Sequence, residues 1–241
     1  PVQCGPDLSP DALRAAFDEQ KRKGVRVRAV LFSSPNNPLG HVYGEEAVKG
    51  LVRFCMDRDL DIISDEIYAQ TVYDPAAKRL STLKLTPEDY VNRVHVTGGF
   101  AKDFALSGFR VGFCHSYNTA LVACMRELSY FACVSSHTQA LLAALLADPD
   151  IHGIIAASNA ALKKCHAWFV SMLARHGIAA APAQAGVLVM ADFSRHVEGD
   201  GEEAERTVWR HLYDRLKLNI SPGHMFGAER CGQCRMCFAQ P

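Results

Sequence analysis

The chain has 241 residues, 49% of them hydrophobic, which is enough to bury a core in one or two domains. Its 26 basic and 26 acidic side chains give no formal net charge, and no apolar run approaches the roughly 20 residues that span a bilayer. We therefore expect neither nucleic acid nor a membrane among its partners. Nine cysteines, several of them among apolar neighbours, indicate free thiols in a reducing compartment, so we expect a cytoplasmic protein.

The first 118 residues alternate predicted helices with predicted strands. Ser9-Pro10-Asp11 is typical of a helix start, because a capping hydroxyl precedes a proline and an acidic residue. Continuous apolar runs predict strands that are covered on both faces. We expect helices over residues 9–23 and 44–58, and strands over 27–32, 60–64, 94–97 and 110–114. Strands joined by right-handed crossovers form an open, mostly parallel α/β sheet.

From residue 119 onward the predicted elements change character. Helices are expected over residues 121–131, 138–146, 151–176 and 202–216, and strands over 186–191 and 234–239. An α/β part followed by an α+β part favours two domains. We predict a large domain over residues 1–118, connecting helices over 119–150 and a smaller C-terminal domain over 151–241.

Asn37, Asp65 and Lys102 each lie just past the end of a predicted strand. Because ligands of open α/β sheets bind outside the carboxyl ends of the strands, these residues are expected to converge on one site. Lys102 is a candidate Schiff-base residue, and Arg110, eight positions on, offers a planar fork suited to a phosphate group. The alternative is a solvated lysine and an unrelated arginine.

Asp65 begins the tetrapeptide Asp65-Glu-Ile-Tyr68. A carboxylate beside the ring nitrogen of pyridoxal 5'-phosphate (PLP) keeps that nitrogen protonated and makes the ring an electron sink. Tyr68 and Asn37 are candidates to hydrogen-bond the phenolic oxygen of the ring. The alternative is that Asp65 only caps a local turn or helix.

Arg235 lies in an apolar run over residues 234–239, where an unpaired guanidinium is costly. A buried partner is therefore expected, either the α-carboxylate of a substrate or a structural carboxylate. Nearby, Cys231, Cys234 and Cys237 have C-x-x-C spacing, with His224 as the nearest further ligand. Alternation along the strand would put Cys234 and Cys237 on opposite faces, so we expect incidental thiols and no metal site.

Six segments, in order along nearly the whole chain, make the sequence resemble the class I and II aminotransferases. They are residues 34–40 (SPNNPLG), 65–68 (DEIY), 102–112 (KDFALSGFRVG), 134–139 (VSSHTQ), 218–223 (LNISPG) and 234–239 (CRMCFA). The 1-aminocyclopropane-1-carboxylate (ACC) synthase branch is the most similar. The resemblance implies a fold-type I PLP enzyme, with residues 1–118 as a partial PLP-binding large domain, and a homodimer.

The resemblance also implies a role for each candidate residue. Lys102 would carry PLP as a Schiff base, Asp65 would pair with the pyridine nitrogen, Asn37 and Tyr68 with the ring oxygen, Arg110 with the phosphate and Arg235 with the carboxylate of an amino-acid substrate. S-adenosylmethionine is one candidate substrate. The implied steps are transaldimination at Lys102, Cα deprotonation and stabilisation of a quinonoid by Asp65. ACC synthases and aminotransferases share these steps, so both reactions stay open.

Two departures from the family pattern concern the lysine segment. Gly99 and Ala101 stand where relatives carry serines, and each lost hydrogen bond to a charged group is worth roughly 1.5–3 kcal/mol. The family's N-terminal portion also has no counterpart in this sequence. A second hypothesis is therefore a non-catalytic or weakly PLP-binding remnant that acts through partner binding. The resemblance further predicts a cis peptide between Asn37 and Pro38.

Overall fold

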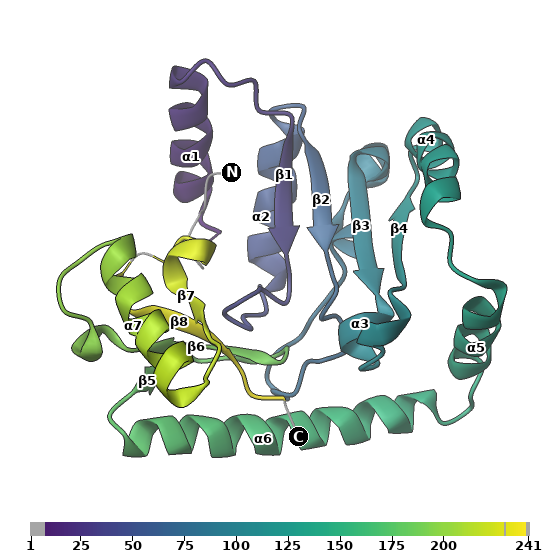
Figure 1. The fold of residues 1–241 in the computed structure, drawn as a ribbon. Coiled ribbons are helices and arrows are strands. Elements are labelled where there is room, and N and C mark those ends of the chain that lie inside the picture. The colour runs from purple at the N-terminus through teal and green to yellow at the C-terminus, as the bar shows by residue number, and fades with distance from the viewer. Residues whose placement is uncertain (1–7, 229, 240–241) are drawn as a thin grey trace.

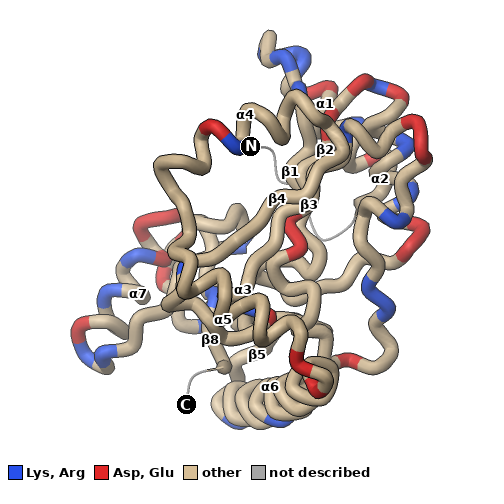
Figure 2. The backbone as a smooth tube through the Cα atoms, turned by 90° about the vertical axis from the view of Figure 1, so that its right-hand side faces the viewer, with Lys and Arg blue, Asp and Glu red and all other residues tan. Residues whose placement is uncertain are grey.

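Two β-sheets, each with its own hydrophobic core, organise the chain (Figure 1). The computed structural model describes residues 8–228 and 230–239. Residues 119–175 form helices that lead from the first sheet to the second. Charged residues of both signs are interspersed along the helices that begin the chain and along the last long helix (Figure 2).

The first sheet has four strands in the order β1-β2-β3-β4. Strands β1 (Ala29–Ser33), β2 (Asp61–Asp65) and β3 (Val94–Gly99) are parallel, and β4 (Gly112–Ser116) is antiparallel to β3. The predicted mostly parallel sheet is therefore confirmed. Strand β4 begins two residues later than predicted, because Arg110 adopts a left-handed conformation with φ of 54°.

Helices α1 (Pro10–Arg22) and α2 (Glu45–Met56) pack against the first sheet. The Ser9 hydroxyl accepts a hydrogen bond of 3.2 Å from the amide of Ala12, as the predicted cap requires. Apolar side chains of α2 meet the sheet at helical spacing. The core contains Leu13, Phe32, Val48, Leu51, Val52, Cys55, Leu60, Ile62 and Val94.

The prediction that the strands are covered on both faces is wrong for β1 and β2, whereas in β3 Val94, His95 and Val96 are all buried. Successive side chains of a strand point to opposite faces, and α1 and α2 cover the face that carries Phe32 and Ile62. On the other face Leu31 is 73% exposed and Ile63 36% exposed. In β1 and β2 the continuous apolar run thus marks strands whose second face is apolar but uncovered in the described residues.

Three helices follow the first sheet. These are α4 (Thr119–Ser129), α5 (Ser136–Leu146) and the 25-residue α6 (Ile151–Arg175), close to the predicted ranges. Helix α6 runs along one side of both sheets (Figure 1). Within the described residues no single helix is long and apolar enough to cross a membrane, although α5 and α6, bent by 89° at their junction, pass by length and composition together.

The second sheet is antiparallel, with the strand order β5-β6-β8-β7. Strands β6 (Leu188–Asp192) and β8 (Gln233–Cys237) match the predicted strands, and α7 (Glu202–Leu216) matches the predicted helix. Strands β5 (Ala179–Ala180) and β7 (Ser221–Pro222) were not predicted, because two residues are too few to show alternation. The core of this sheet includes Leu173, Val189, Ala191, Ile220 and Met236.

Short helices complete the described chain. Helix α3 (Phe100–Asp103) is a single turn directly after β3. The 3₁₀ helices are Thr82–Leu85, Glu88–Arg93, Ser107–Phe109, Tyr130–Ala132, Ser194–His196 and Gly223–Phe226. The peptide between Asn37 and Pro38 is cis, as predicted, and so is the one between Ser34 and Pro35.

The loop after β1 connects the two sheets through Gly40. Its carbonyl oxygen accepts hydrogen bonds from the amides of Gln184 (2.9 Å) and Ala185 (3.0 Å). Gly40 has φ of +63°, and a Cβ atom there would lie 2.5 Å from the carbonyl oxygen of Ala185. Only glycine fits this conformation and this close approach. The loop that carries Asn37 is therefore held against the segment that leads into β6.

Candidate cofactor site

The carboxyl ends of the three parallel strands lie next to one another. Asp65 is the last residue of β2 and pairs in register with Ser33 of β1 and Thr97 of β3. Asn37 follows β1 in the loop, and Lys102 lies in α3 directly after β3. The topology thus brings these three positions to one edge of the sheet, as ligand sites in open α/β sheets require.

Asp65 is half-buried at this edge. One of its carboxylate oxygens accepts a hydrogen bond of 3.1 Å from the amide of Ile67, so the residue does cap the turn that follows β2. Burial raises the pKa of Asp65, and the bond from Ile67 acts in the opposite direction. The local cap and a ligand-facing role are compatible, because one carboxylate accepts several hydrogen bonds.

Tyr68 is buried in the turn after Asp65, with only 3% of its surface exposed. The pKa of its hydroxyl is raised to about 12, mainly by burial. The positive charge of Arg235 acts against this shift, and the negative charge of Asp65 adds to it. The phenol therefore lies within electrostatic reach of both residues. The Thr71 hydroxyl donates to the carbonyl of Tyr68 at 2.8 Å and accepts from the amide of Gly186 at 3.2 Å, which fixes the turn.

Arg235 reaches from β8 of the second sheet toward the loop after β1. Its guanidinium donates to the side-chain oxygen of Asn37 at 3.3 Å and to the hydroxyl of Ser221 at 3.4 Å. The guanidinium carbon lies 4.0 Å from the centroid of the Phe226 ring. No described carboxylate pairs with Arg235, so its charge is available to an anionic group. The structural ion pair is not found among the described residues.

Lys102 and Arg110 are both exposed, and no described contact joins them to Asp65 or Tyr68. The guanidinium of Arg110 donates to the backbone carbonyl of Ser107 at 3.3 Å. The described interactions thus connect Asn37 with Arg235, and the charge of Arg235 reaches the hydroxyl of Tyr68. Lys102 belongs to the same edge only through the order of the strands, and no described interaction joins Arg110 to this group. The candidate site thus takes residues from two sheets, and Lys102 on its open side is exposed.

Gly99 is packed too closely for a serine. A Cβ atom there would lie 2.9 Å from the carbonyl oxygen of Val111 and 3.2 Å from Cα of Gly112, both of them backbone atoms of the neighbouring strand region. The glycine is therefore matched to the local packing of β3 against β4. A hydroxyl donor at this position would require the backbone to shift.

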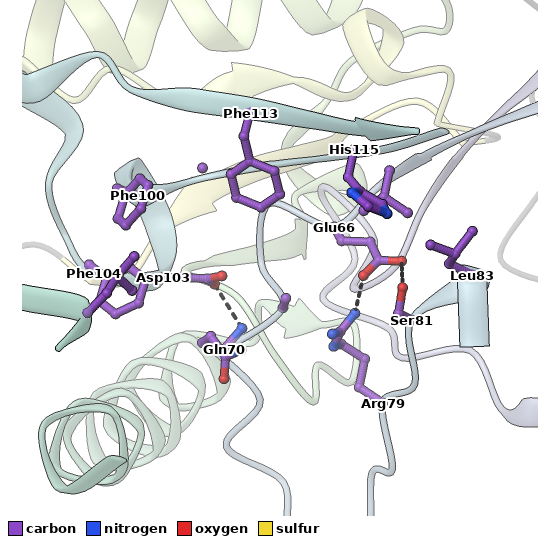
Figure 3. A pocket seen from close by; sticks show the side chains of 14 residues that line it. Glu66, Gln70, Arg79, Ser81, Leu83, Phe100, Asp103, Phe104, Phe113 and His115 are labelled. Atoms are coloured by element: carbon purple, nitrogen blue, oxygen red, sulfur yellow. Dashed lines mark hydrogen bonds and ion pairs between the residues drawn. The ribbon is translucent and has the colours of Figure 1, made fainter. Parts of the chain in front are cut away.

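Asp103 is a carboxyl group that sequence analysis did not single out. It follows Lys102, and one of its oxygens accepts a hydrogen bond of 2.9 Å from the amide of Gln70 (Figure 3). Burial raises the pKa of Asp103 to about 7, although the hydrogen bond from Gln70 and the charge of Arg79 act in the opposite direction. It lines a cavity of about 510 Å³ together with Phe100, Phe104, Phe113 and His115. The only sequence signal was an acid directly after the lysine.

The cysteine-rich strand carries no described metal site. In residues 8–228 and 230–239, no group of three or more His, Cys, Asp or Glu side chains could hold a metal ion. Cys234 is buried and Cys237 exposed. His224 instead hydrogen-bonds the buried carboxylate of Glu205 at 2.7 Å, and the amide of Gly232 donates to Glu205 at 2.8 Å.

The family model for class I and II aminotransferases matches residues 5–241. The chain belongs to this family. Curated relatives include ACC synthase 3 from Oryza sativa subsp. japonica, 40% identical over 99% of this chain and 57% of the relative. ACC synthase CMW33 from Cucurbita maxima is 36% identical over 95% of this chain and 47% of the relative. The chain thus spans about half the length of these curated relatives.

Solved aminotransferase structures share the fold. The aspartate aminotransferase of Thermus thermophilus with maleate superposes with a TM-score of 0.81 at 23% identity, over 97% of this chain and 56% of that chain. The N-succinyldiaminopimelate aminotransferase of Mycobacterium tuberculosis gives 0.81 at 22% identity, over 99% and 59%. This likeness confirms the predicted α/β fold of the aminotransferases.

Serine substitutions at Gly99 and Ala101 are predicted to differ in stability. Gly99→Ser should lower the free energy of unfolding by about 1–3 kcal/mol, since its side chain meets backbone atoms. Ala101→Ser, in the single turn of α3, should change it by less than about 1 kcal/mol. Urea unfolding followed by circular dichroism measures both, and equal losses in the two variants would contradict the close packing at Gly99.

Proposed function

We propose that this chain belongs to a PLP-dependent enzyme that acts on an amino acid, either ACC synthase-like or an aminotransferase. The observation that carries the proposal is the hydrogen bond from Arg235 to Asn37, together with the effect of the Arg235 charge on the buried hydroxyl of Tyr68. It brings a guanidinium that has no described carboxylate partner from one sheet to polar groups at the carboxyl ends of the other. Membership of the aminotransferase family supports the same reading.

The available groups fit PLP. A half-buried carboxylate, a buried phenol, an amide and a guanidinium without a described carboxylate partner lie at the strand ends, with a lysine in the turn after β3. When bound, PLP supplies an aldehyde for amino groups and a ring that accepts negative charge from Cα. In this assignment Lys102 would hold the aldehyde carbon, Asn37 and Tyr68 would donate to the ring oxygen, and Arg110 would bind the phosphate.

Each protein group has a defined task in the proposed reaction. The Asp65 carboxylate would accept a hydrogen bond from the protonated ring nitrogen, and this interaction would compensate the cost of burying its charge. Arg235 binds the substrate carboxylate with its planar fork and so orients the Cα–H bond. The free amine of Lys102 would take the proton from Cα of the bound substrate. These tasks are common to the two candidate reactions.

Two broader assignments accompany this proposal. Residues 1–118 form the partial large domain, 119–150 the connecting helices and 151–241 the small domain; the two separate cores support this division.

Buried free thiols at Cys55 and Cys234 support a cytoplasmic location. Limited proteolysis, with first cuts expected within residues 119–150, and cell fractionation test the two assignments.

Lys102 is expected to form the covalent link. PLP is added to the protein, the visible absorbance is recorded, and borohydride reduction is followed by mass mapping of the modified lysine. The adduct should lie on Lys102, should be absent in Lys102→Arg, and should persist in the control Lys163→Arg, which changes an exposed lysine of α6. An unmodified Lys102 in the wild-type protein would favour the remnant that acts through partner binding.

Arg235→Gln is expected to weaken binding of L-amino acids at least about tenfold, because the planar fork for the carboxylate is lost. The affinity for PLP should stay within about threefold, since Arg235 binds the substrate. The control ligand is the amine that carries the same side chain but lacks the carboxylate, and its affinity should not change. Spectral titration of the PLP-loaded protein measures both, and an equal loss for acid and amine rules out carboxylate recognition.

A homodimer is the proposed assembly. Exposed apolar side chains gather where α4 ends, with Leu128 65%, Tyr130 80% and Phe131 88% exposed, and such groups are typical of association surfaces. Sedimentation equilibrium should give twice the 26.4 kDa mass of the chain. Phe131→Ser should shift the equilibrium toward monomer, whereas Tyr213→Ser, on α7, should not. A wild-type monomer at micromolar concentration would count against this assembly.

A further inference from the structure

The side chain of Asp103 connects two segments that each carry a residue of the proposed site. Its carboxylate accepts the amide hydrogen of Gln70 at 2.9 Å, although the two residues are 33 positions apart (Figure 3). Asp103 is the last residue of α3, next to Lys102. Gln70 closes the turn that begins at Glu66 and contains Tyr68.

The Gln70 peptide is held from both sides. Its amide donates to Asp103, and its carbonyl oxygen accepts a hydrogen bond of 2.9 Å from the side-chain amide of Asn159 on α6. Within the turn, the amide of Ala69 donates to the carbonyl of Glu66 at 2.9 Å. Because α3 is only four residues long, a side-chain bond of this kind has a large share in setting its orientation.

We propose that Asp103 is a positioning residue, which sets the place of Lys102 relative to Tyr68 by bonding from α3 to the backbone of Gln70. This inference rests on the proposed PLP function of Lys102 and Tyr68. Asp103 itself touches neither cofactor nor substrate. Its effect passes through the backbone of the adjacent lysine and of the Tyr68 turn.

Burial of Asp103 also makes its contribution to stability depend on pH. Burial raises the pKa of Asp103 to about 7 from an ordinary 3.8. The native state then holds this proton between about pH 4 and 7, where the unfolded chain has lost it, so Asp103 contributes less stability as the pH rises through that window. The other titratable side chains that line the cavity are Glu66, Arg79 and His115. An ionised Asp103 is thus costly to the fold above pH 7.

Because an ionised Asp103 costs stability, two substitutions at this position are expected to behave differently. Asp103→Asn keeps a side-chain oxygen for the Gln70 amide and removes the buried charge; Asp103→Ala removes the bond as well. At pH 8 Asp103→Asn should be at least as stable as the wild type to urea. Asp103→Ala should bind PLP roughly tenfold more weakly, and the pH midpoint of its visible band should shift, because Lys102 and Tyr68 are no longer held together.

The control is Asp148→Ala, which removes a carboxylate that accepts the Asp150 amide at 2.8 Å in an exposed turn. It should leave PLP affinity, band midpoint and exchange in the site unchanged. Amide hydrogen exchange without cofactor is the second readout: Asp103→Ala should speed exchange in residues 66–71 and 100–106 together.

The outcomes separate the two proposals. A wild-type protein without a reducible adduct on Lys102 ends the PLP function, whereas the exchange result still decides whether Asp103 joins the two segments. If the wild type forms the adduct but Asp103→Ala matches Asp148→Ala in affinity and midpoint, the positioning role is overturned. A loss of stability in Asp103→Asn at pH 8, with PLP binding unchanged, would overturn it as well and leave only a structural bond.

Discussion

The contact between the loop after β1 and the second sheet is the constraint on which the site depends. Arg235 and Asn37 are 198 positions apart, and their side chains meet only because two sheets lie against each other. The Gly40 carbonyl accepts two amide hydrogens from residues 184 and 185 and holds the loop in place. If this contact opened, the guanidinium would leave the strand ends that carry Asp65 and Tyr68. The packing of the two sheets against each other therefore determines the geometry of the site.

The burial of polar groups at this junction gives the site its electrostatic character. Desolvation raises the pKa values of Asp65 and Tyr68, while the charge of Arg235 acts against the shift at Tyr68. Arg235 itself has neutral hydrogen-bond partners and an aromatic ring beside it. A carboxylate and a guanidinium are thus kept apart without a mutual ion pair, and each can take a ligand group of opposite charge. Groups whose pKa values are shifted by burial and by a charged neighbour cluster at functional sites, which makes this edge of the sheet a candidate site.

Sequence reasoning succeeded where local pattern decides structure. The helices and longer strands have periodic or continuous apolar stretches, and the ends of the strands predicted the shared edge of Asn37, Asp65 and Lys102. It failed where the structure depends on contacts between residues far apart in the sequence, or on strands of only two residues. The uncovered face at Leu31 depends on what packs above it, and the two-residue strands β5 and β7 exist only as partners of β6 and β8. The bonds of Arg235 to Asn37 and of Asp103 to Gln70 join residues that no spacing rule relates.

The central claim is that residues from both sheets form one site that removes a proton from the Cα of an amino acid. Proton NMR in D₂O measures this step directly, before any difference between ACC synthase-like and aminotransferase chemistry. L-amino acids and S-adenosylmethionine are incubated with PLP and the protein, and the Cα proton signal is followed. We expect this signal to be lost faster with the wild type than with PLP alone for at least one substrate. An equal rate for every substrate would contradict it.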